Sequence, residues 1–453
     1  MGCLYQESSP LPLLQDLNVK IQDISLVFPS QETPRKSMFL SNIDQVLNFN
    51  VETVHFFPPH KDFPPHFVAQ KLKKALSEIL VPYDFLAGRL SCNAKTGRLE
   101  IDCNAAGAVF VVASCEFTLD EIGDLVYPNP GFKQLIIKSF DNNILGKEDH
   151  PLCIFQVTSF KCGGFAMGLS TNHATFDGLS FKIFLQNLAA LAADKPLTVI
   201  PSNDRHALAA RSPPRVTHDH PEMIKLIIPP GQESNNAPIF DATPEDLDFK
   251  IFRLTSSDIS DLKTKAASEN GKHVTGFNVV TALIWRCKAL SYNASDENEQ
   301  LDRESRMLYA VDIRSRLNPP LPVSYTGNAV LSAYATARCE ELKTEAFWKV
   351  VERVAEGAKR MSDEYARSAI DWGEINRGYP HGEFLVSSWW RLGFSKVEYP
   401  WGKPRYSCPV VYHKKDIILF FPDIDDENGI NVLVSLPSKE MLKFETLFYE
   451  FLG

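Results

Sequence analysis

The amino-acid sequence predicts an α/β protein built from two or three domains. Short apolar runs with the length of buried strands alternate with stretches whose apolar residues recur at helical spacing. A chain of 453 residues is longer than one ordinary hydrophobic core accommodates. After Pro196 the sequence becomes rich in Pro, Asn, Ser and His and loses its periodicity, which is typical of a long crossover. We therefore expect an N-terminal domain over residues 1–196, a linker over 197–237 and a C-terminal domain over 238–453.

The N-terminal part is predicted to be rich in strands. One clear amphipathic helix covers residues 67–80, where the apolar side chains share a face, and Pro82 ends it. The strands are apolar or alternating runs bounded by turn-forming residues. They are predicted over residues 21–27, 51–57, 98–103, 108–114, 134–139, 153–160 and 165–170.

The C-terminal part continues this mixture of strands and helices. Capping residues at 255–258 predict the start of one helix, and a nearly continuous apolar run over 275–287 predicts a buried one. Two further helices are expected over 342–364 and 438–451. Strands are predicted over residues 248–254, 307–313, 329–336, 416–422 and 429–436, with the last two paired.

Composition excludes several classes of function. The formal net charge of −9 argues against general binding to nucleic acid or to an anionic membrane. The N-terminus lacks the pattern of a secretory signal, and no apolar run reaches the length of a transmembrane helix. We expect a cytoplasmic protein with no nucleic-acid partner and no membrane insertion.

Metal sites and disulfide bonds are also not expected. The nine cysteines are scattered singly, and none forms a Cys-x-x-Cys pair, which favours free thiols in a reducing compartment. Three histidines of the linker, His206, His218 and His220, have a spacing unlike that of a metal motif. We expect these histidines in a solvated segment.

The stretch 168–178 is the strongest candidate for catalytic chemistry. It joins a buried strand to an amphipathic helix that begins after Asp177, and a carboxylate there can cap free backbone N–H groups. His173 lies in the polar turn between the two elements. A rigid turn fixes the position of an imidazole, and an imidazole accepts and returns protons near neutral pH. The other interpretation is a loop histidine without a catalytic role, because His and Asp four residues apart recur by chance.

Six separated stretches together form a recognisable pattern. In chain order they are Leu40–Asp44 (LSNID), Pro82–Leu90 (PYDFLAGRL), His173–Gly178 (HATFDG), Val311–Arg314 with Tyr325–Asn328 (VDIR and YTGN), Ser387–Trp389 (SSW) and Pro400–Pro404 (PWGKP). This series resembles the motifs of the plant BAHD acyl-CoA-dependent acyltransferases, including their H-x-x-x-D-G motif. Because the matches extend from residue 40 to residue 404, the resemblance covers most of the chain.

The resemblance implies a fold and a reaction. The fold is α/β: two domains like chloramphenicol acetyltransferase, with mixed sheets flanked by helices, joined by the long crossover loop. An active-site tunnel between them would admit acyl-CoA and a small-molecule alcohol or amine, with His173 as general base. Acyl-CoA would be a co-substrate, no cofactor would be bound permanently and no metal would be needed. The family expectation is a monomer.

The resemblance also assigns roles to individual residues. Asp177 would support the turn structurally and would not relay protons. A donor to the oxyanion of the tetrahedral intermediate is expected from Ser387 or Trp389. The candidates on the cofactor side are Arg314, Thr326, Gly327, Asn328, Trp401, Gly402 and Lys403. Packing is the alternative role for Trp401, and a solvated basic loop is the alternative for Lys403.

One stretch departs from the family pattern. The family has D-F-G-W-G where this chain has Glu398 to Gly402 (EYPWG). Glu398 keeps the negative charge on a longer side chain, and Pro400 fixes φ at about −65° and removes a donor. In the family this loop supports the cofactor side through a carboxylate–arginine pair, for which Arg314 is the candidate partner of Glu398. We expect a loop of different shape and an altered use of CoA.

The resemblance therefore implies an O-acyltransferase of plant specialised metabolism. It would move an acyl group from a CoA thioester to an alcohol, or an amine, of a specialised or a cuticle- or wall-type metabolite. The 30 phenylalanines favour an aromatic acyl group such as hydroxycinnamoyl, or a long chain. The departing loop motivates the alternative, which is a ligand-binding protein, or a CoA-independent lyase or esterase, on the same fold.

Overall fold

The computed structural model describes residues 14–126, 129–137, 150–225, 246–267, 274–293, 301–410 and 416–453. These residues form two compact units. The described parts of Met1–Leu40, Phe49–Asn203 and Gly393–Val411 make the first unit, and those of Ser41–Asn48, Asp204–Leu392 and Tyr412–Gly453 make the second. The units are interleaved along the chain, whereas the sequence-based division is linear. The predicted boundary between residues 237 and 238 lies outside the described residues.

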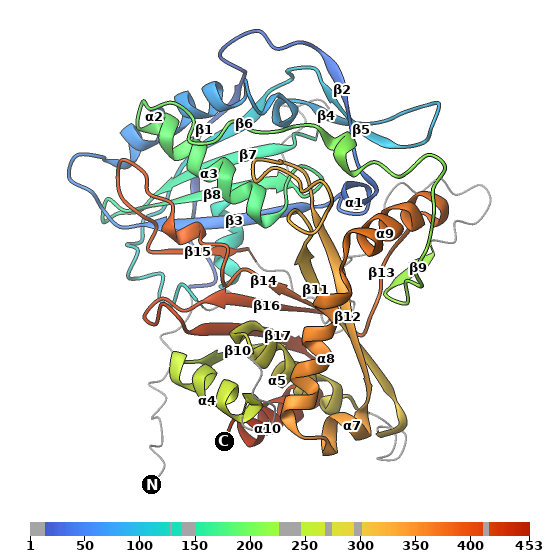
Figure 1. Ribbon diagram of the computed structural model, residues 1–453. Helices are drawn as coiled ribbons and strands as arrows, with labels where there is room; N and C mark the ends of the chain where they lie inside the picture. Colours follow the sequence, from blue (N-terminus) through green and yellow to red (C-terminus); the bar gives the residue numbers. More distant parts are fainter. Residues whose placement is uncertain are drawn as a thin grey trace. The chain divides into compact units, whose positions relative to one another are not determined.

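The first unit is built on a six-stranded sheet in the order β1-β6-β7-β8-β3-β15. Neighbours β6 and β7 are parallel, and the other pairs are antiparallel. The strands are β1 (Lys20–Val27), β3 (Asn50–Phe57), β6 (Ala108–Ser114), β7 (Cys153–Ser159), β8 (Phe165–Asn172) and β15 (Tyr406–Pro409). Helices α2 (Pro65–Ile79) and α3 (Gly178–Ala192) lie side by side against this sheet (Figure 1). A smaller sheet has the order β2-β5-β4, from β2 (Lys36–Phe39), β4 (Arg89–Cys92) and β5 (Leu99–Cys103).

The predicted strand over 134–139 is wrong in its first residues. Leu135 ends the 3-10 helix η2 (Pro130–Leu135), which Asn129 opens by accepting a hydrogen bond from the Gly131 N–H at 2.8 Å. Residues 138 and 139 lie outside the described residues. The apolar side chains of η2 belong to the hydrophobic core of the first unit. They are buried, as expected for a strand of the core, but their backbone is helical.

The second unit is built on a sheet in the order β10-β17-β16-β14-β11-β12. Its parallel pairs are β11–β14 and β14–β16. The strands are β10 (Asp248–Leu254), β11 (Glu304–Asp312), β12 (Val330–Arg338), β14 (Phe384–Ser388), β16 (Ile417–Pro422) and β17 (Ile430–Leu436). Helices α4 (Ser256–Ala267), α5 (Gly276–Ser291) and α10 (Ser438–Leu452) share its core, and α5 is almost wholly buried. No helix in the described ranges is long and apolar enough to cross a membrane.

The single helix predicted over 342–364 is wrong, because three helices occupy this part of the chain. They are α7 (Cys339–Thr344), α8 (Phe347–Arg360) and α9 (Asp363–Asn376). The backbone becomes extended at Glu345 and again at Ser362, whose side chain accepts a hydrogen bond from the Tyr365 N–H and caps α9. Ser362 followed by acidic residues is a helix-start signal that the sequence contained.

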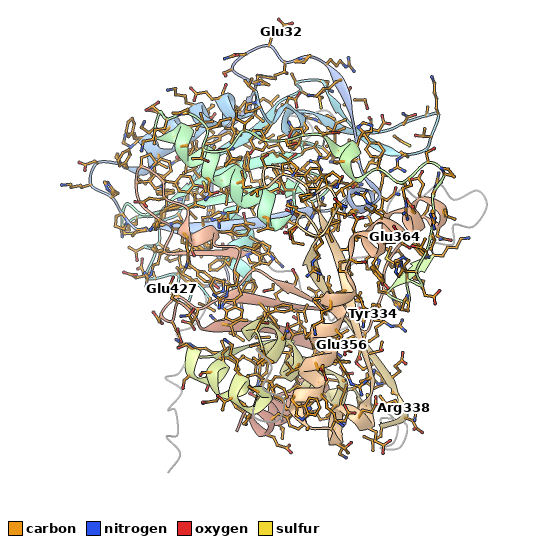
Figure 2. All side chains as sticks on the ribbon, viewed as in Figure 1. Glu32, Tyr334, Arg338, Glu356, Glu364 and Glu427 are labelled. Carbon is orange, nitrogen blue, oxygen red and sulfur yellow. The ribbon has the colours of Figure 1, made fainter. Side chains whose placement is uncertain are left out.

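The predicted linker contains a segment that packs on α9. This crossover segment (residues 204–225) holds the short 3-10 helix η3 (Arg205–Leu208) and strand β9 (Met223–Lys225), which pairs with β13 (Gly378–Pro380). The side chain of Arg211 in this segment forms ion pairs with two carboxylates of α9. They are Asp371 at 2.6 Å and Glu364, which is labelled in Figure 2, at 3.0 Å.

The three linker histidines do not share one environment. His206 and His218 are exposed, as expected, but His220 is buried, so the expectation of a solvated residue is wrong for it. The Nε2 atom of His220 contacts the hydroxyl of Ser368 on α9, which lies 148 residues further along the chain.

Candidate active site

The turn that holds His173 is fixed on both sides. All eight residues of β8 are buried before it, and helix α3 begins at Gly178 after it. Within the turn, Asn172 Oδ1 accepts a hydrogen bond from the Ala174 N–H at 3.0 Å, and the Thr175 hydroxyl donates to the Asn172 carbonyl at 2.5 Å. His173 itself is half-buried, while its neighbours on both sides are buried. In this turn the imidazole of His173 is therefore partly exposed, whereas the residues around it are buried.

Asp177 forms the N-cap of α3, as the sequence predicts. Its carboxylate accepts hydrogen bonds from the Ser180 N–H and from the Ser180 hydroxyl, both at 2.9 Å, and its own N–H donates to Ser180 Oγ at 3.0 Å. Only 3% of Asp177 is exposed. The negative charge lies at the positive end of the helix dipole, which stabilises both the helix start and the turn before it.

Phe49, the residue directly before β3, is a neighbour of His173. The backbone N–H of His173 donates to the Phe49 carbonyl at 2.8 Å. The two rings have centroids 5.2 Å apart and planes inclined by 50°. Phe49 directly precedes β3, which pairs with β8 from Asn50 opposite Asn172 onward. The end of the β3–β8 pair thus fixes the backbone position of His173.

An aromatic cluster anchors the helix side of the turn. The Phe176 ring lies 5.2 Å from that of Phe184, 5.7 Å from Phe85 and 6.0 Å from Tyr83. The Tyr83 hydroxyl accepts a hydrogen bond from Asn187 Nδ2 at 3.0 Å. Tyr83 and Phe85 lie in the stretch of the second family-like motif. Their packing against the helix explains why that motif and the histidine motif belong to one structural unit.

His55, a buried histidine on β3, was not among the residues singled out from the sequence. On β3, His55 Nδ1 lies 2.8 Å from the hydroxyl of Ser407, and Nε2 lies 3.3 Å from Thr53 Oγ1. Burial lowers the pKa of His55 to about 3, because the charged imidazolium loses its hydration. His55 is therefore neutral at physiological pH and joins β3 to β15. The alternating pattern of residues 51–57 predicted a half-buried strand, and it gave no sign of the partner on β15, which is 352 residues away.

Ser387 and Trp389 lie in the second unit, at and just after the end of β14. Both are half-buried. The backbone N–H of Trp389 donates to the Phe420 carbonyl at 2.7 Å, so this amide is already used by the sheet. The backbone N–H of Trp389 is therefore not available as an oxyanion donor, which leaves the side chain of this residue as the candidate.

Arg314 lies inside a framework of the second unit. Its guanidinium donates to Asp312 Oδ1 at 3.0 Å, to the Gly327 carbonyl at 3.1 Å and to the Tyr325 carbonyl at 3.3 Å. Thr326 is buried as well. A Cβ atom at Gly327 would lie 2.7 Å from the Arg205 guanidinium, so the Arg205 side chain would have to shift to admit it. These contacts favour a role in holding the loop.

Asn328 belongs to the same framework through Asp44. The Asn328 N–H and side-chain amide donate to Asp44 Oδ1 at 3.1 and 2.8 Å, and Arg205 forms an ion pair with that oxygen at 3.2 Å. Asp44 and Asn328 are completely buried. Buried charges are stable only when paired and hydrogen-bonded, and this network satisfies that condition.

The departing loop forms a tight turn in the first unit. The Tyr399 and Gly402 backbones exchange hydrogen bonds of 3.1 and 2.9 Å. Pro400 occupies the second position of this turn, where a proline is favoured and its missing N–H is not needed. Gly402 has a φ of +99°, a conformation that side chains disfavour. The proline thus fits the turn that this chain forms.

In this loop the side chain of Trp401 is buried, whereas those of Glu398 and Lys403 are exposed. Trp401 is 2% exposed and packs against Phe57, Phe63 and Phe165 at centroid distances of 6.0 to 6.3 Å. This is the packing role that was the alternative for Trp401. Lys403 is exposed and lies 3.7 Å from the exposed carboxylate of Glu398. In the part of the chain that the structure describes, no three His, Cys, Asp or Glu side chains are grouped to hold a metal ion.

The chain is similar to known acyltransferases along its whole length. A model described as "Transferase family" matches residues 17–451. Acyltransferase GLAUCE of Arabidopsis thaliana is 61% identical over 99% of this chain and 99% of its own. Omega-hydroxypalmitate O-feruloyl transferase of Arabidopsis thaliana is 34% identical over 96% of this chain and 93% of its own.

Two solved structures share the fold. Vinorine synthase superposes with a TM-score of 0.73 over 94% of this chain and 96% of its own, at 24% identity. TRI101 of F. graminearum, in complex with coenzyme A and T-2 mycotoxin, superposes with a TM-score of 0.70 over 91% of this chain and 97% of its own, at 15% identity. These matches confirm the predicted α/β architecture of two mixed sheets with flanking helices.

Proposed function

This chain belongs to the BAHD acyltransferase family and is an O-acyltransferase, and from that premise we propose that it transfers a hydroxycinnamoyl group from CoA to the hydroxyl of a long-chain aliphatic acceptor, with His173 as general base. The observation that carries the role of His173 is its turn. A single half-buried imidazole stands between a fully buried strand and a capped helix.

The proposed reaction proceeds through one tetrahedral intermediate. Neutral His173 takes the proton of the acceptor hydroxyl while the alkoxide oxygen attacks the thioester carbonyl. The oxyanion forms, the C–S bond breaks, and the CoA thiolate receives the proton from the imidazolium. General-base help of this kind contributes ~10²–10⁴ in rate. Fixing both reactants beside one immobile imidazole contributes through orientation, which is why a rigid turn suits this step.

The other predicted site residues support this reaction in different ways. Asp177 holds the turn, because its carboxylate is engaged by Ser180. The side chains of Ser387 and Trp389 are the candidate donors to the oxyanion. Arg314 and Asn328 maintain the loop of the second unit, and Lys403 remains the exposed candidate for a CoA phosphate.

The choice of donor and acceptor rests on the relatives. The name of the Arabidopsis relative at 34% identity gives feruloyl as the group transferred and omega-hydroxypalmitate as the acceptor. A second relative, 32% identical over 95% of this chain, is named fatty alcohol:caffeoyl-CoA acyltransferase. Both names combine a hydroxycinnamoyl donor with a long aliphatic hydroxyl compound. Coenzyme A in the TRI101 complex supports acyl-CoA as the co-substrate.

The experiment is a matrix of purified protein with acyl-CoAs and acceptors. Feruloyl-CoA, caffeoyl-CoA and acetyl-CoA are each combined with 16-hydroxypalmitate, a long-chain primary alcohol, the matching long-chain amine and shikimate, and products are detected by mass spectrometry. We expect ester formation from feruloyl- or caffeoyl-CoA with the aliphatic alcohols. Turnover only with acetyl-CoA, with the amine or with shikimate would overturn the proposed substrates.

Two controls separate the substrate class from the enzyme class. Isothermal titration with CoA and with feruloyl-CoA tests donor binding directly, and no binding of either would favour the alternative of a CoA-independent protein on this fold. His173→Ala is expected to bind feruloyl-CoA with unchanged affinity and to lose transfer. Retained turnover in a folded His173→Ala protein would end the assignment of the base.

A further inference from the structure

Phe49 makes two separate contacts with His173. Its carbonyl accepts the hydrogen bond from the His173 N–H at 2.8 Å, which fixes the backbone. Its ring lies 5.2 Å from the imidazole centroid at an inclination of 50°, which limits rotation of the imidazole about its side-chain bonds. A substitution of Phe49 removes the second contact and keeps the first. The effect of the ring can therefore be measured by itself.

Phe49 lies at the point where the chain passes from the second unit into the first. Residues 41–48 belong to the second unit, and Phe49 is the first residue of the following stretch of the first unit. Helix α1 (Asn42–Gln45) is capped by Ser41, and its buried Asp44 carries the bonds from Asn328 and the ion pair with Arg205. After Phe49, strand β3 continues in register with β8. Within its own unit, Phe49 thus leads directly into a paired strand, which fixes its backbone.

We propose that Phe49 is a positioning residue for the catalytic imidazole: its ring holds the side chain of His173 in the orientation from which it takes the acceptor proton. The inference rests on the proposed role of His173 as general base. It extends that role to a residue outside all six family-like stretches, because Phe49 follows the first of them and precedes the second. The ring does not touch the reacting atoms in this account, and it acts only through the imidazole.

The expected size of the effect follows from orientation. Misplacing a reacting group by 1 Å can cost roughly 10²-fold in rate, and a loosened imidazole samples the productive position only part of the time. We expect Phe49→Leu to lower kcat about 10-fold and to leave KM for both substrates nearly unchanged. Phe49→Tyr keeps the ring and should keep most of the activity.

The experiment pairs kinetics with a signal that needs no substrate. Rates are measured with feruloyl-CoA and 16-hydroxypalmitate. In parallel, protein with ¹³C-labelled histidine is observed by NMR without ligands, and His173→Gln assigns the His173 resonance. Phe110→Leu is the matched control. Phe110 is a buried ring of the same sheet, on β6, two strands away from β8, and it stacks on Phe155.

We expect one sharp His173 resonance in the wild-type protein and in Phe49→Tyr. Phe49→Leu should give a broadened or split resonance together with the fall in kcat. Phe110→Leu should lower the melting temperature without changing the His173 signal or kcat. A sharp single resonance in Phe49→Leu would overturn the positioning role, and so would an unchanged kcat. If no variant, including wild type, turns over these substrates, the proposed substrates fail, and the NMR comparison still decides the role of Phe49.

Discussion

The imidazole of His220 lies 2.9 Å from the hydroxyl oxygen of Ser368, and this contact joins the crossover segment to helix α9. The other ring nitrogen of His220 lies 3.0 Å from the Glu222 carboxylate, which also accepts a hydrogen bond from the Tyr365 hydroxyl at 2.8 Å. Serine, histidine and glutamate in this order resemble a hydrolytic triad. Ser368 is completely buried on α9, however, so its hydroxyl is part of a structural connection.

Removing this hydroxyl should loosen the crossover segment. Ser368 Oγ also accepts hydrogen bonds from the backbone N–H groups of Thr217 and His218 at 2.9 and 3.1 Å. Ser368→Ala leaves these donors and His220 without that partner, at a cost of about 1–3 kcal/mol. We expect a lower melting temperature and faster proteolysis within residues 204–225. Ser260→Ala, at an exposed position of α4, is the control and should change neither. Equal behaviour of the two variants would contradict the structural role.

Gly168 on β8 should not tolerate a side chain. A Cβ atom at this position would clash with the backbone carbonyl of Leu135 and lie 3.2 Å from the Ile136 side chain. Because a backbone group cannot move aside as a long side chain can, Gly168→Ala should displace η2 or bend β8. We expect a loss of about 1–3 kcal/mol in the free energy of unfolding, measured by urea denaturation. A stability equal to wild type would show that η2 does not pack this closely in solution.

The stability of the first unit should fall in weak acid because of His55. Its pKa is lowered from 6.5 to about 3 in the folded protein, so below pH 6.5 the unfolded chain binds a proton that the folded chain does not. Stability is therefore fully present above pH 6.5 and decreases by about 1.4 kcal/mol for each pH unit below it, until the folded pKa is reached. Urea unfolding at pH 7 and pH 5 in wild type and His55→Gln measures this. The same pH dependence in both proteins would rule out His55 as its source.

Asp177 and His173 should respond differently to substitution. Asparagine is as good an N-cap as aspartate, so Asp177→Asn should keep the turn, whereas Asp177→Ala should lose about 1 kcal/mol of stability. His173→Ala should keep the melting temperature and lose ~10²–10⁴ in rate. Thermal unfolding and steady-state transfer from feruloyl-CoA measure both properties. If a stably folded Asp177→Asn loses as much activity as His173→Ala, Asp177 takes part in proton transfer and does more than cap α3.

Residue patterns close to His173 in the sequence were sufficient to predict the local elements around the candidate site. The strand before His173, the cap at Asp177 and the helix after it depend on residues within one or two turns of each other, so periodicity and capping rules predict them. The same holds for the strands at 108–114 and 248–254, which the structure reproduces. The single helix predicted over 342–364 is broken at Glu345 and again at Ser362, and at Ser362 a local capping signal was present.

The contacts between these elements and distant parts of the chain depend on the tertiary fold. The burial of His220 requires Ser368, the neutral His55 requires Ser407, and the enclosure of Asn328 requires Asp44, which lies 284 residues earlier. The helical backbone at Leu135 is similarly packed against Gly168 of a later strand. Local propensity contains no information about partners so far along the chain. The burial of these side chains and their hydrogen-bond partners are set when the elements of each unit pack onto its sheet. They can therefore be read only from the folded molecule.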